Sequence, residues 1–305
     1  AVPTGVKIFN WLFTLYGGRI RFTVPIYWTL GFMVTFVLGG LTGVLLAVPP
    51  VDFVLHNSTF LVAHFHNVII GGVVFGAMAG FNYWFPKAFG FTLDDRWGKA
   101  SFWCWLIGFY LAFMPLYLLG LMGMTRRLEH IPDPSWQPLL LVAEAGAIVI
   151  FLAILCQIAQ LYVSIRTREQ RRDLTGDPWN GRTLEWSTSS PPPAYNFAVL
   201  PRVETIDAFW EMKRRGLTPG LTPVEPAYQA IEMPRNSPIG FLTAFFAVIV
   251  GFSAIWHIWW LVILGFLAAA VGVLAFGWSE NREREISGTE LAQMERARLG
   301  LGRPA

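Results

Sequence analysis

Long apolar runs constrain the fold of this chain most, because several of them are long enough to cross a lipid bilayer. A membrane-spanning helix takes roughly 20 apolar residues. Such runs occupy about 24–48, 58–85, 100–122 and 137–165. Only 14% of the 305 residues are charged and 54% are hydrophobic, which excludes an ordinary soluble domain. We therefore predict an all-α fold, a polytopic bundle of transmembrane helices.

The remaining segments complete a prediction of about seven helices. Residues 1–16 form a helix too short to span, so we expect the chain to be truncated at its N-terminus. The apolar stretch 239–276 is too long for one helix and suits two short ones, with a turn at Trp256–Trp260. We predict four parts: a main group of transmembrane helices (1–165), a cytoplasmic connection (166–238), two accessory transmembrane helices (239–277) and a cytoplasmic tail (278–305).

The distribution of basic residues predicts the orientation. Of the 23 Lys and Arg, 20 fall in alternate connections and the tail, among them Arg19, Arg21 and Lys87. Only Arg126 and Arg127 fall on the other side. Since Lys and Arg concentrate on the cytoplasmic side, we expect the long connection and the C-terminus to be cytoplasmic.

Two histidines lie inside the run 58–85, in the sequence His64-Phe65-His66. An ionisable side chain at membrane depth indicates a functional site. Residues i and i+2 point roughly 200° apart on a helix, so one metal ion cannot easily bind both imidazoles. Imidazole is a common axial ligand of haem iron. The pair therefore favours one helix between two haems, and hydrogen bonding to neighbouring helices is the alternative.

Arg126 and Arg127 follow the run 100–122 on the outer side, where no other basic residue lies. The histidines lie about 9–12 Å below that surface, from the helical rise per residue. Guanidinium groups bind carboxylates with two parallel hydrogen bonds. We therefore expect Arg126 and Arg127 to bind haem propionates, although they could be solvated surface residues.

Other polar residues have weaker assignments. Lys7, roughly 14 Å from the cytoplasmic end of its helix, has Thr4 on the same face, and we favour a proton path over a lysine that extends to the surface. Asp52 and His56 are spaced i, i+4 on the outer side and fit either an ion or proton site or a helix cap with its partner. Glu144, near the outer end of its helix, remains unassigned.

Small residues complete the pattern. Cys104 and Cys156 lie within apolar runs and are expected to be packing residues. Glycines at every fourth position, Gly39 and Gly43 in one run and Gly72, Gly76 and Gly80 in the next, predict close helix contacts.

These residues lie in longer motifs that resemble subunit I of the heme–copper respiratory oxidases, most of all the bo-type ubiquinol oxidases. The motifs are VPTGVKIFNW, VDFVLHNS, FLVAHFHNVIIGGVVFGAMAGFNYWFPKAFGF, FMPLYLLGLMGMTRRL and GDPWNGRTLEWSTSSPPPAYNFAVLP, followed by DAFWEMK. The resemblance extends over about residues 1–276 and implies the C-terminal portion of that fold. Asn67 after the histidines, where cytochrome c oxidases usually have Tyr, and the two extra C-terminal helices resemble the quinol oxidases.

The resemblance implies a role for each matching residue. His64 resembles the proximal ligand of a high-spin haem (haem o or a), and His66 an axial ligand of a low-spin haem b. Phe65 resembles the residue between the haems, and Arg126 and Arg127 resemble the propionate partners. Lys7 and Thr4 resemble a proton-input channel. Asp52 and His56 resemble a pair near the propionates.

The resemblance also implies reduction of O2 to water by quinol, coupled to proton pumping, in the bacterial inner membrane. Partners would be ubiquinol, O2, membrane lipid, oxidase subunits II, III and IV and a missing N-terminal part of subunit I, with no nucleic acid. The family's copper ligands, its cross-linked tyrosine and its second low-spin haem ligand have no counterpart here, since His56, His130 and His257 are not deep in helices. We therefore expect copper only with the missing helices, and a fragment inactive alone.

Three alternatives remain. One is a fragment of a cytochrome c oxidase. Another is a haem-binding membrane scaffold or remnant without oxygen chemistry, which would have no use for Lys7 and Thr4. The third is a transporter, which should show repeated broken helices; the sequence shows none.

Overall fold

A computed structural model describes residues 2–201, 203–216, 228–279 and 282–298. Ala1, Arg202 and Arg303, which entered the predictions above, lie outside the described residues. Within the described part the chain divides into two compact units. The first contains residues 1–192 and 207–211, and the second contains residues 193–206 and 212–305.

The first unit is helical and contains most of the predicted membrane spans. Its helices are α1 (Val2–Leu15), α2 (Val24–Leu46), α3 (Pro49–Leu55), α4 (Thr59–Val68), the π-helix η1 (Ile69–Val74), α5 (Phe75–Phe89), α6 (Asp95–Leu121) and α7 (Gln137–Arg166). Short 3-10 turns η2 (Pro134–Trp136), η3 (Arg168–Arg171) and η4 (Leu184–Ser187) follow α6 and α7, and α8 (Ala208–Arg214) begins in this unit.

The second unit contains a helical hairpin and a two-stranded sheet. The hairpin is α9 (Ile239–Ile255) and α10 (Trp259–Trp278), which turns at the predicted place. Strands β1 (Ile231–Pro234) and β2 (Glu283–Ile286) pair antiparallel, with Ile231 opposite Ile286, and α11 (Gly288–Arg298) follows. His257 is exposed at the hairpin turn, as predicted.

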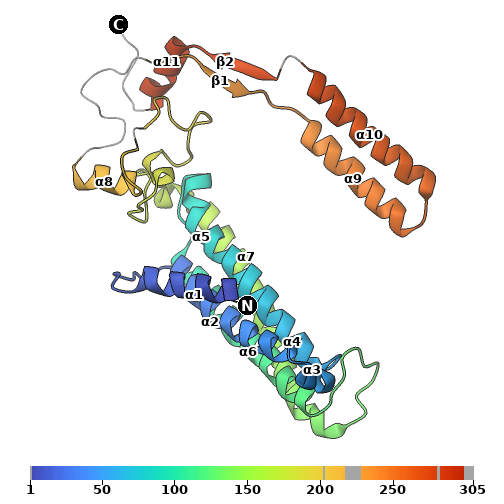
Figure 1. The fold of residues 1–305 in the computed structure, drawn as a ribbon. Helices are drawn as coiled ribbons and strands as arrows, with labels where there is room; N and C mark the ends of the chain where they lie inside the picture. Colours follow the sequence, from blue (N-terminus) through green and yellow to red (C-terminus); the bar gives the residue numbers. More distant parts are fainter. Residues whose placement is uncertain (1, 202, 217–227, 280–281, 299–305) are drawn as a thin grey trace. The chain divides into compact units, whose positions relative to one another are not determined.

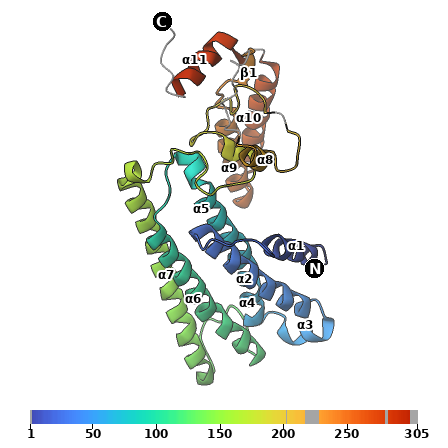
Figure 2. The same ribbon diagram turned by 90° about the vertical axis from the view of Figure 1, so that its left-hand side faces the viewer.

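The predicted fold class is confirmed. Within the described residues, five helices are long and apolar enough to cross a membrane, and α9 is a shorter apolar helix. Helices α2, α4–α5, α6 and α7 run alongside one another in the first unit, whereas α1 crosses α2 steeply (Figures 1 and 2). No residue of α1 is buried, which separates it from the other helices of this unit.

An aromatic core holds α2, α5 and α6 together. Trp28 of α2 is fully buried and meets Phe75 and Phe102 edge-on, with ring centroids 5.2 and 5.3 Å away. Such edge-to-face pairs are each worth about 0.5–1.5 kcal/mol beyond the area they bury. The helix that carries the two histidines is thereby fixed against α2 and α6.

The predicted glycine contacts are present in part. A Cβ on Gly39 would lie 3.0 Å from Cβ of Asn67, and one on Gly72 would lie 3.0 Å from Cδ2 of Phe36, so α2 and the histidine helix approach closely there. Gly76 and Gly80 meet no other helix as tightly. The closest approach is elsewhere, where a Cβ on Gly146 of α7 would lie 2.2 Å from the Ala112 nitrogen of α6.

A buried polar network joins α5, α6 and α7, and we call it the Gln160 cluster. Gln160 is fully buried and donates through Nε2 to Asn82 Oδ1 (3.0 Å) and to the Asp94 carbonyl (3.1 Å), while its Oε1 accepts from Gln157 (3.0 Å). The other members bond to these residues or to their helices. The cluster consists of Asn82, Asp94, Ser101, Gln157, Gln160, Ser164 and Arg171.

The prediction that Lys87 lies in a connection is wrong. Pro86 does not end α5, which continues to Gly90, a residue in the left-handed region (φ 78°) that terminates it. Lys87 is 8% exposed and donates to the carbonyls of Gly176 (2.9 Å) and Thr188 (2.7 Å). Its charge therefore holds residues 176–189 against the end of α5.

Candidate haem-binding site

The histidine helix begins at a capped end. Ser58 Oγ accepts from the Phe60 amide at 3.2 Å, which satisfies one of the free donors at the start of α4. The helix continues through α4, η1 and α5 over 31 residues, from Thr59 to Phe89. His64, Phe65 and His66 lie in α4 and are half-buried.

His64 faces α2. Its Nδ1 lies 3.0 Å from the Gly39 carbonyl oxygen and 3.1 Å from Thr42 Oγ1. A Cβ on Gly43 would lie 2.8 Å from His64 Cε1. The glycine at this position therefore leaves the space that the imidazole ring occupies.

His66 faces α6. Its ring stacks on Phe113, with centroids 4.2 Å apart and planes 20° from parallel. Its Nδ1 lies 2.7 Å from the Val62 carbonyl oxygen, one turn earlier in the same helix. Phe65 touches the same ring, with centroids 4.4 Å apart. The two imidazoles thus contact different helices, as their i, i+2 spacing predicts.

Both imidazoles are held in the same tautomer. A carbonyl oxygen can only accept, so the Nδ1 atoms of His64 and His66 each donate a proton to one. The Nε2 atom then carries the lone pair, and neither Nε2 has a hydrogen-bond partner within the described part of the chain. A histidine fixed through one nitrogen with the other free is the usual arrangement of a metal ligand. The donor set fits two separate haem irons.

A second polar network surrounds His64, and we call Thr42, His64, Asn67 and Tyr117 the His64 cluster. Thr42 Oγ1 lies 3.0 Å from the Tyr117 hydroxyl, and Asn67 Nδ2 donates to that hydroxyl at 3.1 Å. Asn67 is fully buried, and its Oδ1 has no hydrogen-bond partner. Thr42 and Tyr117 are not among the predicted site residues, since one sequence does not reveal which helices are neighbours.

The arginine pair lies beside the start of the histidine helix. The Arg126 amide donates to the Asn57 carbonyl at 2.9 Å, and Arg126 Nε donates to Asn57 Oδ1 at 3.1 Å. Thr59, the first residue of α4, donates its amide to the Met124 carbonyl at 2.9 Å. Arg126 is half-buried and Arg127 is exposed. Arg126 is thus fixed at the end of the helix that bears the histidines, and Arg127 is its exposed neighbour.

Asp52 and His56 form a pair in the segment that joins α2 to α4. Asp52 lies on α3 and His56 caps its C-terminal end, with His56 Nδ1 3.5 Å from Asp52 Oδ2 and side-chain exposures of 65% for His56 and 41% for Asp52. Asp52 also lies in the first turn of α3, where the helix dipole stabilises a negatively charged carboxylate. Over the described residues, no group of three or more His, Cys, Asp or Glu could hold a metal ion.

The remaining candidates are exposed within this chain. Thr4 and Lys7 lie on α1, and Glu144 lies on the open face of α7. Cys104 and Cys156 are half-buried free thiols on α6 and α7.

Comparison with known proteins identifies the family. Residues 1–149 match the family model described as cytochrome c and quinol oxidase polypeptide I. The chain is 61% identical to a probable cytochrome c oxidase subunit 1 of Bradyrhizobium diazoefficiens over 98% of its length, which is 45% of that protein. It is 57% identical to a cytochrome bo(3) ubiquinol oxidase subunit 1 of Buchnera aphidicola over 97% of its length, and 54% identical to a ubiquinol oxidase subunit 1 of Acetobacter aceti.

The chain therefore spans a little under half the length of the curated relatives it matches. Its helices and its histidine-bearing motif both agree with the family match. The chain belongs to the heme–copper oxidase subunit I family.

Proposed function

We propose that this chain is part of the catalytic subunit of a respiratory terminal oxidase, which reduces O2 to water with electrons from quinol and pumps protons. The observation that carries the proposal is the arrangement of His64 and His66. They lie on one helix, contact different neighbouring helices, and each has Nε2 free while a carbonyl holds Nδ1. We expect His64 to bind the high-spin haem and His66 the low-spin haem b.

In this proposal the chain's residues position the haems. Phe65 lies between the two imidazoles in sequence and packs on His66, where it would separate the two haems. Arg126 and Arg127 would bind propionates as bidentate donors, with Asn57 holding the Arg126 guanidinium in place. When bound, the haems would supply one-electron transfer and the site of oxygen binding.

The residues present do not fit a copper site. The chain has five histidines, of which His56, His130 and His257 lie at helix ends or in loops. A copper ion would need ligands from a longer subunit. The proposed activity accordingly belongs to an assembly with such a part and with further subunits, embedded in the bacterial inner membrane with the C-terminus cytoplasmic.

Lys7 and Thr4 remain the proposed proton input. Lys7 is a cation on an otherwise apolar helix, with Thr4 one turn earlier on the same face. Asp52 and His56, which lie 3.5 Å apart, are the proposed pair near the propionates. Glu144 has no role in this proposal.

The electron donor has two candidates. Asn67 and the α9–α10 hairpin favour quinol, and relatives called ubiquinol oxidases share this chain almost end to end. The 61% identical relative called a probable cytochrome c oxidase favours cytochrome c. Oxygen uptake by the assembled enzyme with ubiquinol or with reduced cytochrome c as the sole donor separates the two.

Histidine substitutions in the complete subunit test the haem assignment. We expect His66→Ala to remove the low-spin haem and His64→Ala to remove the high-spin haem, each seen as loss of one component of the reduced optical spectrum. Oxygen uptake should fall to background in both, since electron transfer would be interrupted at different points.

His257→Ala is the matched control, because this histidine is exposed at the α9–α10 turn. It should leave both haem signals intact. Retention of both haems in His64→Ala and His66→Ala would contradict the assignment.

A further inference from the structure

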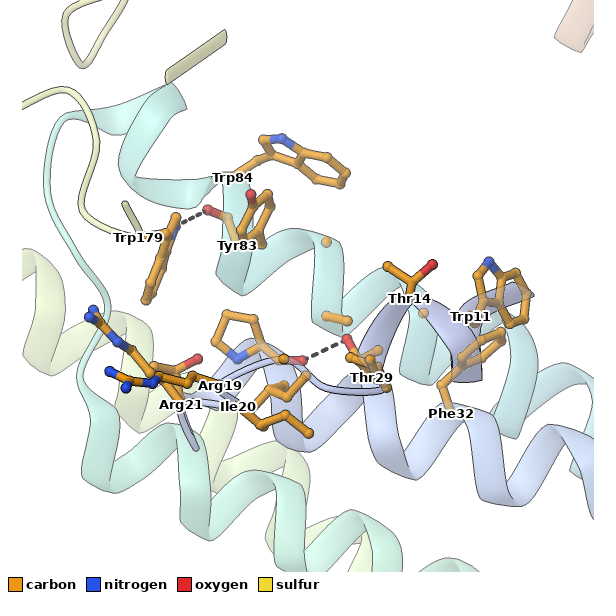
Figure 3. Close-up of a pocket in the computed structure, with 18 of the residues that line it drawn as sticks. Trp11, Thr14, Arg19, Ile20, Arg21, Thr29, Phe32, Tyr83, Trp84 and Trp179 are labelled. Atoms are coloured by element: carbon orange, nitrogen blue, oxygen red, sulfur yellow. Dashed lines mark hydrogen bonds between the residues drawn. The ribbon is translucent and has the colours of Figure 1, made fainter. Parts of the chain in front are cut away.

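A hollow of about 900 Å³ lies in the first unit, beside the end of α1. Its wall comes from Trp11–Leu15 of α1, the loop 18–23, the first turns of α2 and residues 76–84 of α5. Trp179 of the connection closes one end (Figure 3). Aromatic and aliphatic side chains form most of this lining, so the hollow suits an apolar occupant.

The polar atoms of the lining are mostly engaged. Thr14 and Thr29 donate to carbonyls one turn back in their own helices, at 2.7 and 2.9 Å. Trp179 Nε1 donates to the Tyr83 carbonyl at 2.8 Å. These groups hold the wall in shape and offer few donors to a ligand.

Arg19 and Arg21 are the exception. In Figure 3 both side chains lie together at the end of the hollow below Trp179. Both are exposed, and neither forms an ion pair within the described part of the chain. The site therefore combines an apolar, aromatic hollow with two free cations at one end.

The position of the hollow selects the class of ligand. Arg19 and Arg21 come just before Val24, where an apolar span begins, and they belong to the basic side of the chain, expected to be cytoplasmic. Basic pockets between transmembrane helices on that side suit anionic lipid headgroups. A soluble anion would make no use of the apolar wall, and a zwitterionic lipid has no net charge for the arginines to attract.

We propose that this hollow binds one anionic phospholipid, with its phosphate at Arg19 and Arg21 and an acyl chain along Trp11, Phe32 and Trp84. The site is separate from the histidine pair and does not depend on the proposed oxidase activity.

Photolabelling of the complete subunit in lipid nanodiscs tests the proposal. The probe is phosphatidylglycerol with a diazirine in one acyl chain, and phosphatidylcholine with the same chains at equal mole fraction is the comparison. Peptide mapping should find the lining residues labelled several-fold more by phosphatidylglycerol. Arg19→Gln with Arg21→Gln should lower that labelling to the phosphatidylcholine level.

Two variants serve as controls. Arg166→Gln with Arg168→Gln removes the same charge from the exposed end of α7 and should leave the labelling unchanged. Arg19→Lys with Arg21→Lys keeps the charge and should retain the preference, which shows that the site needs cations at these positions.

Several results would overturn the proposal. They are equal labelling by the two lipids, an unchanged preference in the Gln variant, absence of label because other protein fills the hollow, or displacement of the label by inorganic phosphate. Since labelling is measured without reference to haem or oxygen, its failure is distinguishable from failure of the proposed oxidase function.

Discussion

The Gln160 cluster lies between α5, α6 and α7, and the His64 cluster lies between α2, α4 and α6. Both are polar networks between helices, but they differ in completeness. In the Gln160 cluster the amide nitrogen and oxygen of Gln160 and both polar atoms of Asn82 have partners. In the His64 cluster, Asn67 Oδ1 is buried and has none. The half-buried His64 accepts no hydrogen bond at Nε2 from the described part of the chain. A buried polar atom without a partner costs about 1–3 kcal/mol.

The difference separates two uses of polarity at membrane depth. A network whose atoms all bond to one another holds helices together, as the Gln160 cluster does for α5, α6 and α7. A network that keeps a lone pair free at a fixed position is suited to a ligand. On this interpretation, the incomplete network is the one beside the proposed haem, and the predictions below test whether the two clusters can be separated by mutation.

The largest expected effect is on the complete network. Gln160→Leu would leave Asn82 Oδ1 and Gln157 Nε2 without their partner and would remove one of the two donors to the Asp94 carbonyl, so we expect a loss of about 3 kcal/mol in the free energy of unfolding. The shift in the midpoint of thermal unfolding of the complete subunit measures this loss of stability. The haem spectrum of the folded fraction should be unchanged.

Gln137→Leu, at the exposed start of the same helix, is the control and should have little effect. Loss of haem from folded Gln160→Leu would show that the two clusters are not separable.

A matched pair of asparagines on the histidine helix compares the clusters directly. Asn82→Leu removes a partner of Gln160 and should cost about 2 kcal/mol, because Gln160 Nε2 keeps only one of its two acceptors. Asn67→Leu also removes the unpaired Oδ1, so we expect a cost under about 1 kcal/mol. Thermal unfolding of both variants measures the two losses in the free energy of unfolding. Equal losses would contradict the distinction between the clusters.

Gly43→Ala should affect the ligand site more than stability. The added Cβ would lie 2.8 Å from His64 Cε1, so the imidazole must shift, at a cost of about 1–3 kcal/mol. We expect reduced high-spin haem content per subunit, measured from the optical spectrum. Gly40→Ala, where nothing lies within 4 Å, should bind haem like the parent. Equal haem content in the two variants would mean that the His64 position is not critical.

The smallest effect concerns a polar contact outside the membrane spans. Tyr195 donates to Glu295 Oε1 at 2.8 Å, and burial together with this carboxylate raises the pKa of Tyr195 to about 12. An unfolded tyrosine has a pKa of about 10. The folded state therefore holds the proton longer, and this contribution to stability is complete below pH 10 and is lost as the pH rises through 12.

The difference in tyrosinate absorbance between the parent and Tyr195→Phe should accordingly show a midpoint near the raised pKa, well above that of an exposed tyrosine. A midpoint at the ordinary pKa would contradict the contact.

The sequence predicts the helices well and their ends less well. Apolar runs place α2, α6, α7, α9 and α10 within a few residues, because hydrocarbon thickness sets the length of a span. The helices extend beyond the apolar runs where capping residues set their ends. Asp94 accepts from the Trp97 amide and starts α6 before the run 100–122. Gly90 ends α5 beyond the run 58–85. Helix α3, in a segment treated as a connection, was not predicted.

The candidate site is predictable only where it depends on one helix. The spacing of His64 and His66 predicts that their rings contact different neighbours. Their hydrogen-bond partners on other helices, Gly39, Thr42 and Tyr117, depend on which helices pack together, and a single sequence does not contain that information. For the same reason, Lys87 was counted as a loop charge although carbonyls of the connection surround it.

The π-helix η1 determines how the two ends of the histidine helix are oriented. One additional residue in a helical turn rotates everything beyond it by roughly 100° about the axis. One face of this helix presents His64 to α2, and another presents Tyr83 and Lys87 to the connection. The π-helix at Ile69–Val74 sets the angle between these two faces about the helix axis. Deleting a single residue there would keep every other side chain but direct one end of the helix toward the wrong neighbours, so the length of this segment matters as much as its composition.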